Sequence, residues 1–256
     1  MSRRTARAAS LPEATLSEYQ GVRSLHLGTI WIQGSMRIAR PDRIELEYVQ
    51  RMLAGLLWVP TELLGQGRAV QLGLGAAALT RFTHKALRMH TTAVELNPSV
   101  ITCCRRHFHL AADGPKLQVL AMDAADWVYD PAQQGSVQLL QVDLYDHDAA
   151  APVLDDERFY AACRGVLAAG GVMSVNLFGR DAYFDDSLAR IAAAFGAPQV
   201  CRLRPTREGN AVVLAGRDVL LPDRPTLLER AATIEARFGG WGLPARKWLR
   251  MLRPMT

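Results

Sequence analysis

Residues 69–78 read AVQLGLGAAA, and they carry the clearest indication of the fold class. A short apolar run that ends in glycines and precedes a helical pattern is typical of a buried strand that turns directly into a helix. The turn has the form G-x-G-x-x-A, with glycines at Gly73 and Gly75. Glycine suits these places because a side chain would hold a ligand away from the backbone amides at the helix start. The unit therefore predicts a nucleotide-binding turn.

Strands and helices continue to alternate after this stretch. We predict further strands at 91–96, 117–122, 137–142 and 172–177, and a closing antiparallel pair at 200–203 and 211–216. Repeated strand–helix units with short links form a doubly wound, mostly parallel sheet, so the expected class is α/β with a Rossmann-like sheet. The expected organisation is a mobile arm at 1–20, a small N-terminal β-strand and helix subdomain at 21–65, the nucleoside-binding catalytic domain at 66–220, and a C-terminal helix with a basic tail at 221–256.

The composition argues against several classes of protein. No apolar stretch approaches the roughly 18–20 residues of a membrane span, and no apolar signal region opens the sequence, so we expect a cytoplasmic protein. The formal net charge is +5, but seven basic residues lie near the two ends, and the other 23 are outnumbered by 25 acidic residues. Nucleic-acid binders carry basic residues on a folded face, so we expect no nucleic-acid partner. The four cysteines form no C-x-x-C pair, and we predict no metal site.

Acidic residues follow the next two predicted strands. Glu95 ends the first of them, and Asp123 and Ala124 follow the second. Ligands of open parallel sheets bind at the carboxyl ends of the strands, so these residues are expected to meet the glycine turn at one edge. Glu95 would accept hydrogen bonds from ribose hydroxyls, Asp123 would accept one from an adenine amino group, and apolar neighbours would cover the ring. The pattern predicts an adenosine site.

The fourth predicted strand runs into QVDLYDH at 141–147, which places Asp143 and Asp146 in the loop above the sheet. The reacting end of a bound nucleoside would lie there, although Asp at a loop start is also a common turn former. Too few residues follow the fifth strand for the second domain of a dinucleotide enzyme. The closing antiparallel pair instead fits the sheet of an S-adenosylmethionine transferase.

At this point the sequence resembles the spermidine synthase family of aminopropyltransferases, in particular its spermidine-synthase-like bacterial branch. The resemblance spans about residues 22–217. It is carried by the glycine turn together with EYVQRM at 47–52, VELN at 94–97, MD at 122–123, DLYD at 143–146, FY at 159–160 and RPT at 204–206.

The resemblance implies an activity and a role for each matching residue. In that family an amine attacks the aminopropyl chain of decarboxylated S-adenosylmethionine in line, and methylthioadenosine leaves. Asp143 would be the base that takes the proton of the amine, and Asp146 would bind the acceptor's ammonium group. Gln50 would contact the donor, and Glu95 and Asp123 would hold its ribose and adenine. The family also implies a homodimer and a nucleoside that is a co-substrate, with no cofactor bound permanently.

The sequence departs from the family pattern in three places. The family's turn carries an aspartate that holds the donor's terminal amine, where this sequence has Ala76. One tyrosine of the acceptor groove aligns with Val49, although Tyr48 is adjacent, and a second aligns with Arg204. Repulsion between a fixed cation in the groove and a dicationic amine would weaken binding of the amine by about 1–4 kcal/mol at close range. We therefore expect an altered groove formed by Asp146, Tyr48 and Arg204, for a small amine or another small acceptor.

Other functions are compatible with the sequence. An S-adenosylmethionine-dependent methyltransferase uses the same sheet, and Ala76 weakens the argument for a decarboxylated donor. A non-catalytic module that binds an adenosine ligand would not need Asp143 and Asp146. A nicotinamide enzyme would rest on the glycine pattern alone. The leading prediction is a transferase that moves an aminopropyl group from decarboxylated S-adenosylmethionine to an amine.

Overall fold

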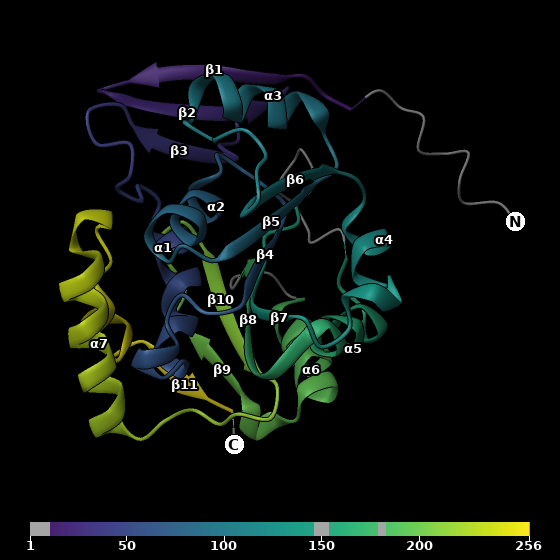
Figure 1. Cartoon of the computed structure of the whole chain (residues 1–256), viewed down its shortest axis with the longest axis vertical. Coiled ribbons are helices and arrows are strands. Elements are labelled where there is room, and N and C mark those ends of the chain that lie inside the picture. Colours follow the sequence, from purple (N-terminus) through teal and green to yellow (C-terminus); the bar gives the residue numbers. More distant parts are fainter. Residues whose placement is uncertain (1–10, 146–153, 179–182, 256) are drawn as a thin grey trace, which may run out of the picture.

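The computed structural model describes residues 11–145, 154–178 and 183–255, and these residues form two sheets with flanking helices (Figure 1). The smaller sheet is antiparallel and has the strand order β1-β2-β3. Its strands are β1 (Ala14–Tyr19), β2 (Val22–Leu27) and β3 (Gly34–Arg37).

The smaller sheet lies against helix α3 (Pro98–His107), at the top of Figure 1. The amide of Ala14 donates to the hydroxyl of Ser99 at 3.0 Å. The guanidinium group of Arg23 donates to the carbonyl of His107 at 2.7 Å. These contacts correct the expected mobile arm at 1–20. Residues 14–19 form a paired strand because they find hydrogen-bond partners on β2 and on α3, whereas residues 1–10 lie outside the described residues.

The larger sheet has eight strands in the order β11-β9-β10-β8-β7-β4-β5-β6. The pairs that join β8, β7, β4, β5 and β6 are parallel, and those that join β10, β9 and β11 are antiparallel. The α/β class and the closing antiparallel pair are thereby confirmed. Its strands are β4 (Arg68–Leu72), β5 (His90–Glu95), β6 (Leu117–Ala121), β7 (Val137–Val142), β8 (Leu167–Phe178), β9 (Val200–Leu203), β10 (Asn210–Gly216) and β11 (Leu252–Pro254).

Helices cover both faces of this sheet and bury alternate strand residues. Ala69 and Leu139 pack into a core with α1, η1 and α7, whereas Val70 and Leu140 pack into a core with α4, α5 and α6. Strands buried on both faces must be apolar on both, which explains the continuous apolar runs of the sequence. The α-helices besides α3 are α1 (Glu47–Met52), α2 (Ala78–Arg81), α4 (Ala124–Val128), α5 (Glu157–Val166), α6 (Phe184–Phe195), α7 (Arg224–Phe238) and α8 (Ala245–Trp248). The chain also forms the 3-10 helices η1 (Leu53–Trp58), η2 (Thr61–Leu63), η4 (Pro131–Gln133), η5 (Ala197–Gln199) and η6 (Gly239–Trp241) and the π-helix η3 (Phe82–Ala86).

The C-terminal segment is folded onto this framework, which corrects the expected basic tail. Trp248 is 1% exposed and packs in the core beside α7. Strand β11 then pairs with β9 and ends the sheet on that side. Within the described ranges, no helix combines the length and the apolar character that crossing a membrane requires.

Candidate active site

A cavity of about 650 Å³ lies at the carboxyl ends of β4, β5, β6 and β7. The strand order reverses beside β4, because β5 lies on one side of it and β7 on the other. Open α/β sheets bind their ligands at such a switch point. Residues 30–33 of the β2–β3 loop and residues 45–48 at the start of α1 complete the cavity wall.

The glycine turn after β4 forms one wall of the cavity, as the sequence predicts. Gly73 has a φ of +84°, and a side chain there would meet the carbonyl oxygen of Asp143 at 2.1 Å. On the other side of the turn β3 is equally close, since a side chain on Gly34 would meet the amide nitrogen of Ala76 at 2.4 Å. Ala76 is therefore buried against β3 and does not line the cavity.

Glu95 links the end of β5 to the glycine turn and faces the cavity. One carboxylate oxygen accepts from the amide of Leu74 at 2.8 Å, and the other accepts from the amide of Asn97 at 2.9 Å. Burial raises the pKa of Glu95 above its ordinary value, and these amide bonds oppose that rise. Each oxygen keeps a second lone pair, so the carboxylate can hold the turn and still accept from a ligand hydroxyl.

Asp123 and Ala124 line the cavity beyond β6, beside Glu95. Asp123 caps helix α4, and its carboxylate accepts from the amide of Ala125 at 2.9 Å. The cap orients the side chain, because a helix start offers unpaired amides on one side only. The residues predicted to hold an adenosine, apart from Gln50, are thereby gathered on one wall.

Asp143 is half-buried in a polar network at the end of β7, where it lines the cavity. Asn176 donates to one of its carboxylate oxygens at 2.9 Å, and the hydroxyl of Tyr48 donates to the other at 3.3 Å. Asn210 in turn donates to the side-chain oxygen of Asn176 at 3.2 Å. Burial raises the pKa of Asp143, and the bonds from Asn176 and Tyr48 oppose the rise. The result is a fixed carboxylate with a raised affinity for a proton.

The described lining of the cavity is acidic. No lysine, arginine or histidine is among the described residues that line it. Glu45 pairs with Arg37 at 2.5 Å, and Glu47 pairs with Arg51 at 2.7 Å, but both guanidinium groups lie outside the lining. A concave site with charges of one sign concentrates ligands of the opposite sign. The six carboxylates belong to Glu45, Glu47, Glu95, Asp123, Asp143 and Glu208.

The structure does not bring every predicted residue to the cavity. The side-chain amide of Gln50 donates to the carbonyl of Ile44 at 2.8 Å, and Gln50 does not line the cavity. Arg204 is exposed and lines a separate pocket, so the expected fixed cation in the acceptor groove is wrong. Tyr48 does line the cavity, whereas Asp146 lies outside the described residues.

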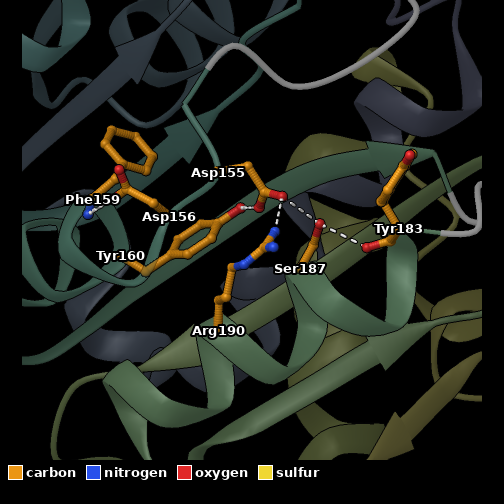
Figure 2. Close-up of polar contacts among 7 residues, drawn as sticks. All are labelled: Asp155, Asp156, Phe159, Tyr160, Tyr183, Ser187 and Arg190. Carbon is orange, nitrogen blue, oxygen red and sulfur yellow. Dashed lines mark hydrogen bonds and ion pairs between the residues drawn. The ribbon is translucent and has the colours of Figure 1, made fainter.

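Asp155 fixes the chain beside Leu154, a residue of the cavity wall. The hydroxyl of Tyr160 donates to one carboxylate oxygen of Asp155, and Ser187 and Arg190 donate to the other, each at 2.7 Å. Figure 2 shows these side chains converging on Asp155 from α5 and α6. Two helices of one layer are thus tied together at the edge of the cavity.

Comparison with known proteins identifies relatives of the whole chain. No family model matches the sequence. The chain is 32% identical over 234 residues to the polyamine aminopropyltransferase of Chromobacterium violaceum, a match that covers 90% of this chain and 86% of that protein.

Solved structures share the fold at lower identity. A probable spermidine synthase from Corynebacterium glutamicum superposes with a TM-score of 0.70 at 18% identity and covers 90% of this chain and 85% of its own. The human methyltransferase-like protein 13, in complex with SAH, superposes with a TM-score of 0.68 at 24% identity, over 76% of this chain and 93% of its own. At 32% identity over most of both sequences, the chain belongs to the polyamine aminopropyltransferase family, the spermidine synthases and their relatives.

Proposed function

We propose that this enzyme transfers the aminopropyl group of decarboxylated S-adenosylmethionine to a small amine, with Asp143 as the base. Family membership supports the reaction type. The acidic lining of the cavity supports the assignment of cationic ligands, and this observation carries the proposal. The donor has a sulfonium and an ammonium group, and the acceptor is an amine, so both are cations. The expected homodimer and cytoplasmic location stay predictions.

The proposed step needs one proton acceptor and no other reactant. The neutral amine attacks the methylene carbon next to the sulfonium, so that a carbon–nitrogen bond forms as the carbon–sulfur bond breaks. The bonding electrons neutralise the sulfur, and methylthioadenosine leaves. The proton released from the new ammonium group passes to Asp143, whose raised pKa suits a base. Asn176 and Tyr48 hold the carboxylate in place during this transfer.

An S-adenosylmethionine-dependent methyltransferase is the second candidate, and Ala76 is the observation that favours it. The resemblance implies an aspartate at that position to hold the amine of a decarboxylated donor. Glu45 offers a replacement, because it lines the same small side pocket as Ala76 and Asp143. A carboxylated donor would instead bring its own negative charge to these groups.

A comparison of donors separates the two candidates. Placing one more carboxylate about 4 Å from another costs about 1–4 kcal/mol for effective dielectric constants between 80 and 20. We therefore expect decarboxylated S-adenosylmethionine to bind about 5- to 1,000-fold more tightly than S-adenosylmethionine, measured by titration calorimetry. Glu45→Gln should reduce this preference, whereas the exposed Glu62→Gln should leave it unchanged. Tighter binding of the carboxylated donor would support the methyltransferase. Donor binding without turnover on any amine would support a non-catalytic module.

Glu95→Ala tests the assignment of the nucleoside wall. Hydrogen bonds to a charged group contribute about 1.5–3 kcal/mol, so methylthioadenosine should bind about 10- to 100-fold more weakly. Since Glu95 also holds the amide of Leu74, the melting temperature of the variant has to be recorded as well. Glu95→Gln keeps the shape of the side chain and should give an intermediate loss. An unchanged affinity in a folded Glu95→Ala variant would show that the ribose lies elsewhere.

A further inference from the structure

Three arginines crowd one side of the β9–β11 edge, away from the active site. The register pairs Arg202 of β9 directly with Arg253 of β11. Arg204 lies two residues beyond Arg202, and its amide continues the pairing by donating to the carbonyl of Met251 at 3.1 Å. Side chains two residues apart on a strand point to the same face, and directly paired residues do so as well. All three guanidinium groups therefore share one surface.

The three arginines line a pocket of about 380 Å³ that shares no lining residue with the active-site cavity. Asp185, at the start of α6, is the one carboxylate among its described lining residues, and it forms no ion pair within the described residues. Arg202 lies over the ring of Phe184 with its guanidinium carbon 5.9 Å from the ring centroid. Leu203 and Pro205 are its other described lining residues.

Among the described lining residues, the one carboxylate of Asp185 does not balance the three guanidinium charges of this pocket. Within the described part of the chain, the side chains of Arg202 and Arg204 make no ion pair, and the guanidinium group of Arg253 donates only to the backbone carbonyls of Arg250 and Leu252. Like charges placed directly opposite each other on neighbouring strands destabilise a sheet. An anion between them would remove this cost and gain charge-assisted hydrogen bonds.

We propose that this pocket binds a small phosphorylated anion. A planar guanidinium group can donate two parallel hydrogen bonds to two oxygens of one phosphate. Three such groups favour a ligand that carries more than one negative charge. The volume lies at the low end of the range for small-molecule sites, so the ligand has the size of a diphosphate or triphosphate moiety. The site is separate from the transferase cavity and does not depend on the reaction assigned to it.

Titration calorimetry and thermal unfolding with sodium pyrophosphate and sodium tripolyphosphate, at constant ionic strength, test this proposal. At about 100 times the dissociation constant, either ligand should raise the melting temperature of the unaltered chain by about 5–10 °C. Tripolyphosphate should bind more tightly than inorganic phosphate. The double variant Arg202→Gln with Arg253→Gln should bind at least 10-fold more weakly. Without ligand at low salt it should also melt higher than the unaltered chain, because the paired charges are gone.

Arg224→Gln is the matched control, since Arg224 is exposed at the start of α7, outside the pocket. It should leave the affinity for tripolyphosphate unchanged. Equal affinity in the double variant and the unaltered chain would overturn the proposal, as would the absence of binding in the unaltered chain. A single-stranded oligonucleotide serves as the other source of phosphate. If it binds more tightly than tripolyphosphate and the double variant removes that binding, the small ligand is the wrong assignment.

Discussion

Asp143→Asn is expected to lower kcat by about 100- to 10,000-fold, the range for loss of a positioned general base. The substitution keeps the shape of the side chain. Its oxygen can still accept from Asn176, and its new amide can donate to the hydroxyl of Tyr48. The network should therefore persist, and donor affinity should stay within a few fold. Initial-rate kinetics with decarboxylated S-adenosylmethionine and a diamine measure the effect on kcat.

The control for this variant is Asp126→Asn, because Asp126 is an exposed aspartate of α4 that does not line the cavity. It should retain full activity. The pH profile of the unaltered enzyme adds a second readout. Protonation of Asp143 removes the base, so activity should fall toward acid, and the raised pKa moves this fall above the ordinary range of an aspartate. If Asp143→Asn keeps more than about a tenth of the turnover, the proton goes to another group.

The wall predicted to hold the nucleoside follows from the sequence because a parallel sheet orders its own strand ends. Gly73, Glu95, Asp123 and Asp143 each lie at the carboxyl end of a strand, and the carboxyl ends of parallel strands meet at one edge. This arrangement can be predicted from the order of the strands, without knowledge of side-chain packing. Their positions at the ends of predicted parallel strands are enough to place these residues together.

The opposite wall depends on pairings that the sequence pattern does not contain. Asn176 and Asn210 reach Asp143 because β8 lies beside β7 and β10 beside β8. The one available signal was a polar residue inside an apolar strand, at Asn176. Glu208 belongs to the β9–β10 connection, and no periodicity predicts where such a connection points.

Arg204 shows how an alignment can misplace a side chain. The family resemblance predicts that Arg204 lies in the acceptor groove, but β9 also pairs with β11, and Arg204 shares a pocket with Arg253 and the start of α6. Strand β11 has three residues, too few for a periodic pattern to reveal. Because the pattern does not reveal β11, the sequence also predicts a basic tail where the C-terminal segment in fact pairs with β9.

Gly73→Ala is expected to have the largest effect on stability, because it combines two separate costs. The φ of +84° is unfavourable for any residue with a side chain, at about 1–2 kcal/mol. The added methyl group would also lie 2.1 Å from the carbonyl oxygen of Asp143. That oxygen cannot yield easily, since the Asp143 amide is bonded to the carbonyl of Leu72 at 2.9 Å. We expect a total loss of about 3–5 kcal/mol, and a melting temperature lower by about 6–20 °C.

Gly170→Ala separates the two costs, because Gly170 has a φ of +74° but no atom within 4 Å of the added methyl group. Strain alone should lower the stability of this control by about 1–2 kcal/mol and leave kcat unchanged. Gly73→Ala should also reduce kcat, since relief of the clash must move the main chain that carries Asp143. Thermal unfolding and initial rates on both variants measure these effects. Equal stability losses would mean that the turn relaxes around the methyl group. Unchanged activity in a folded Gly73→Ala variant would mean that the position of Asp143 does not depend on the turn.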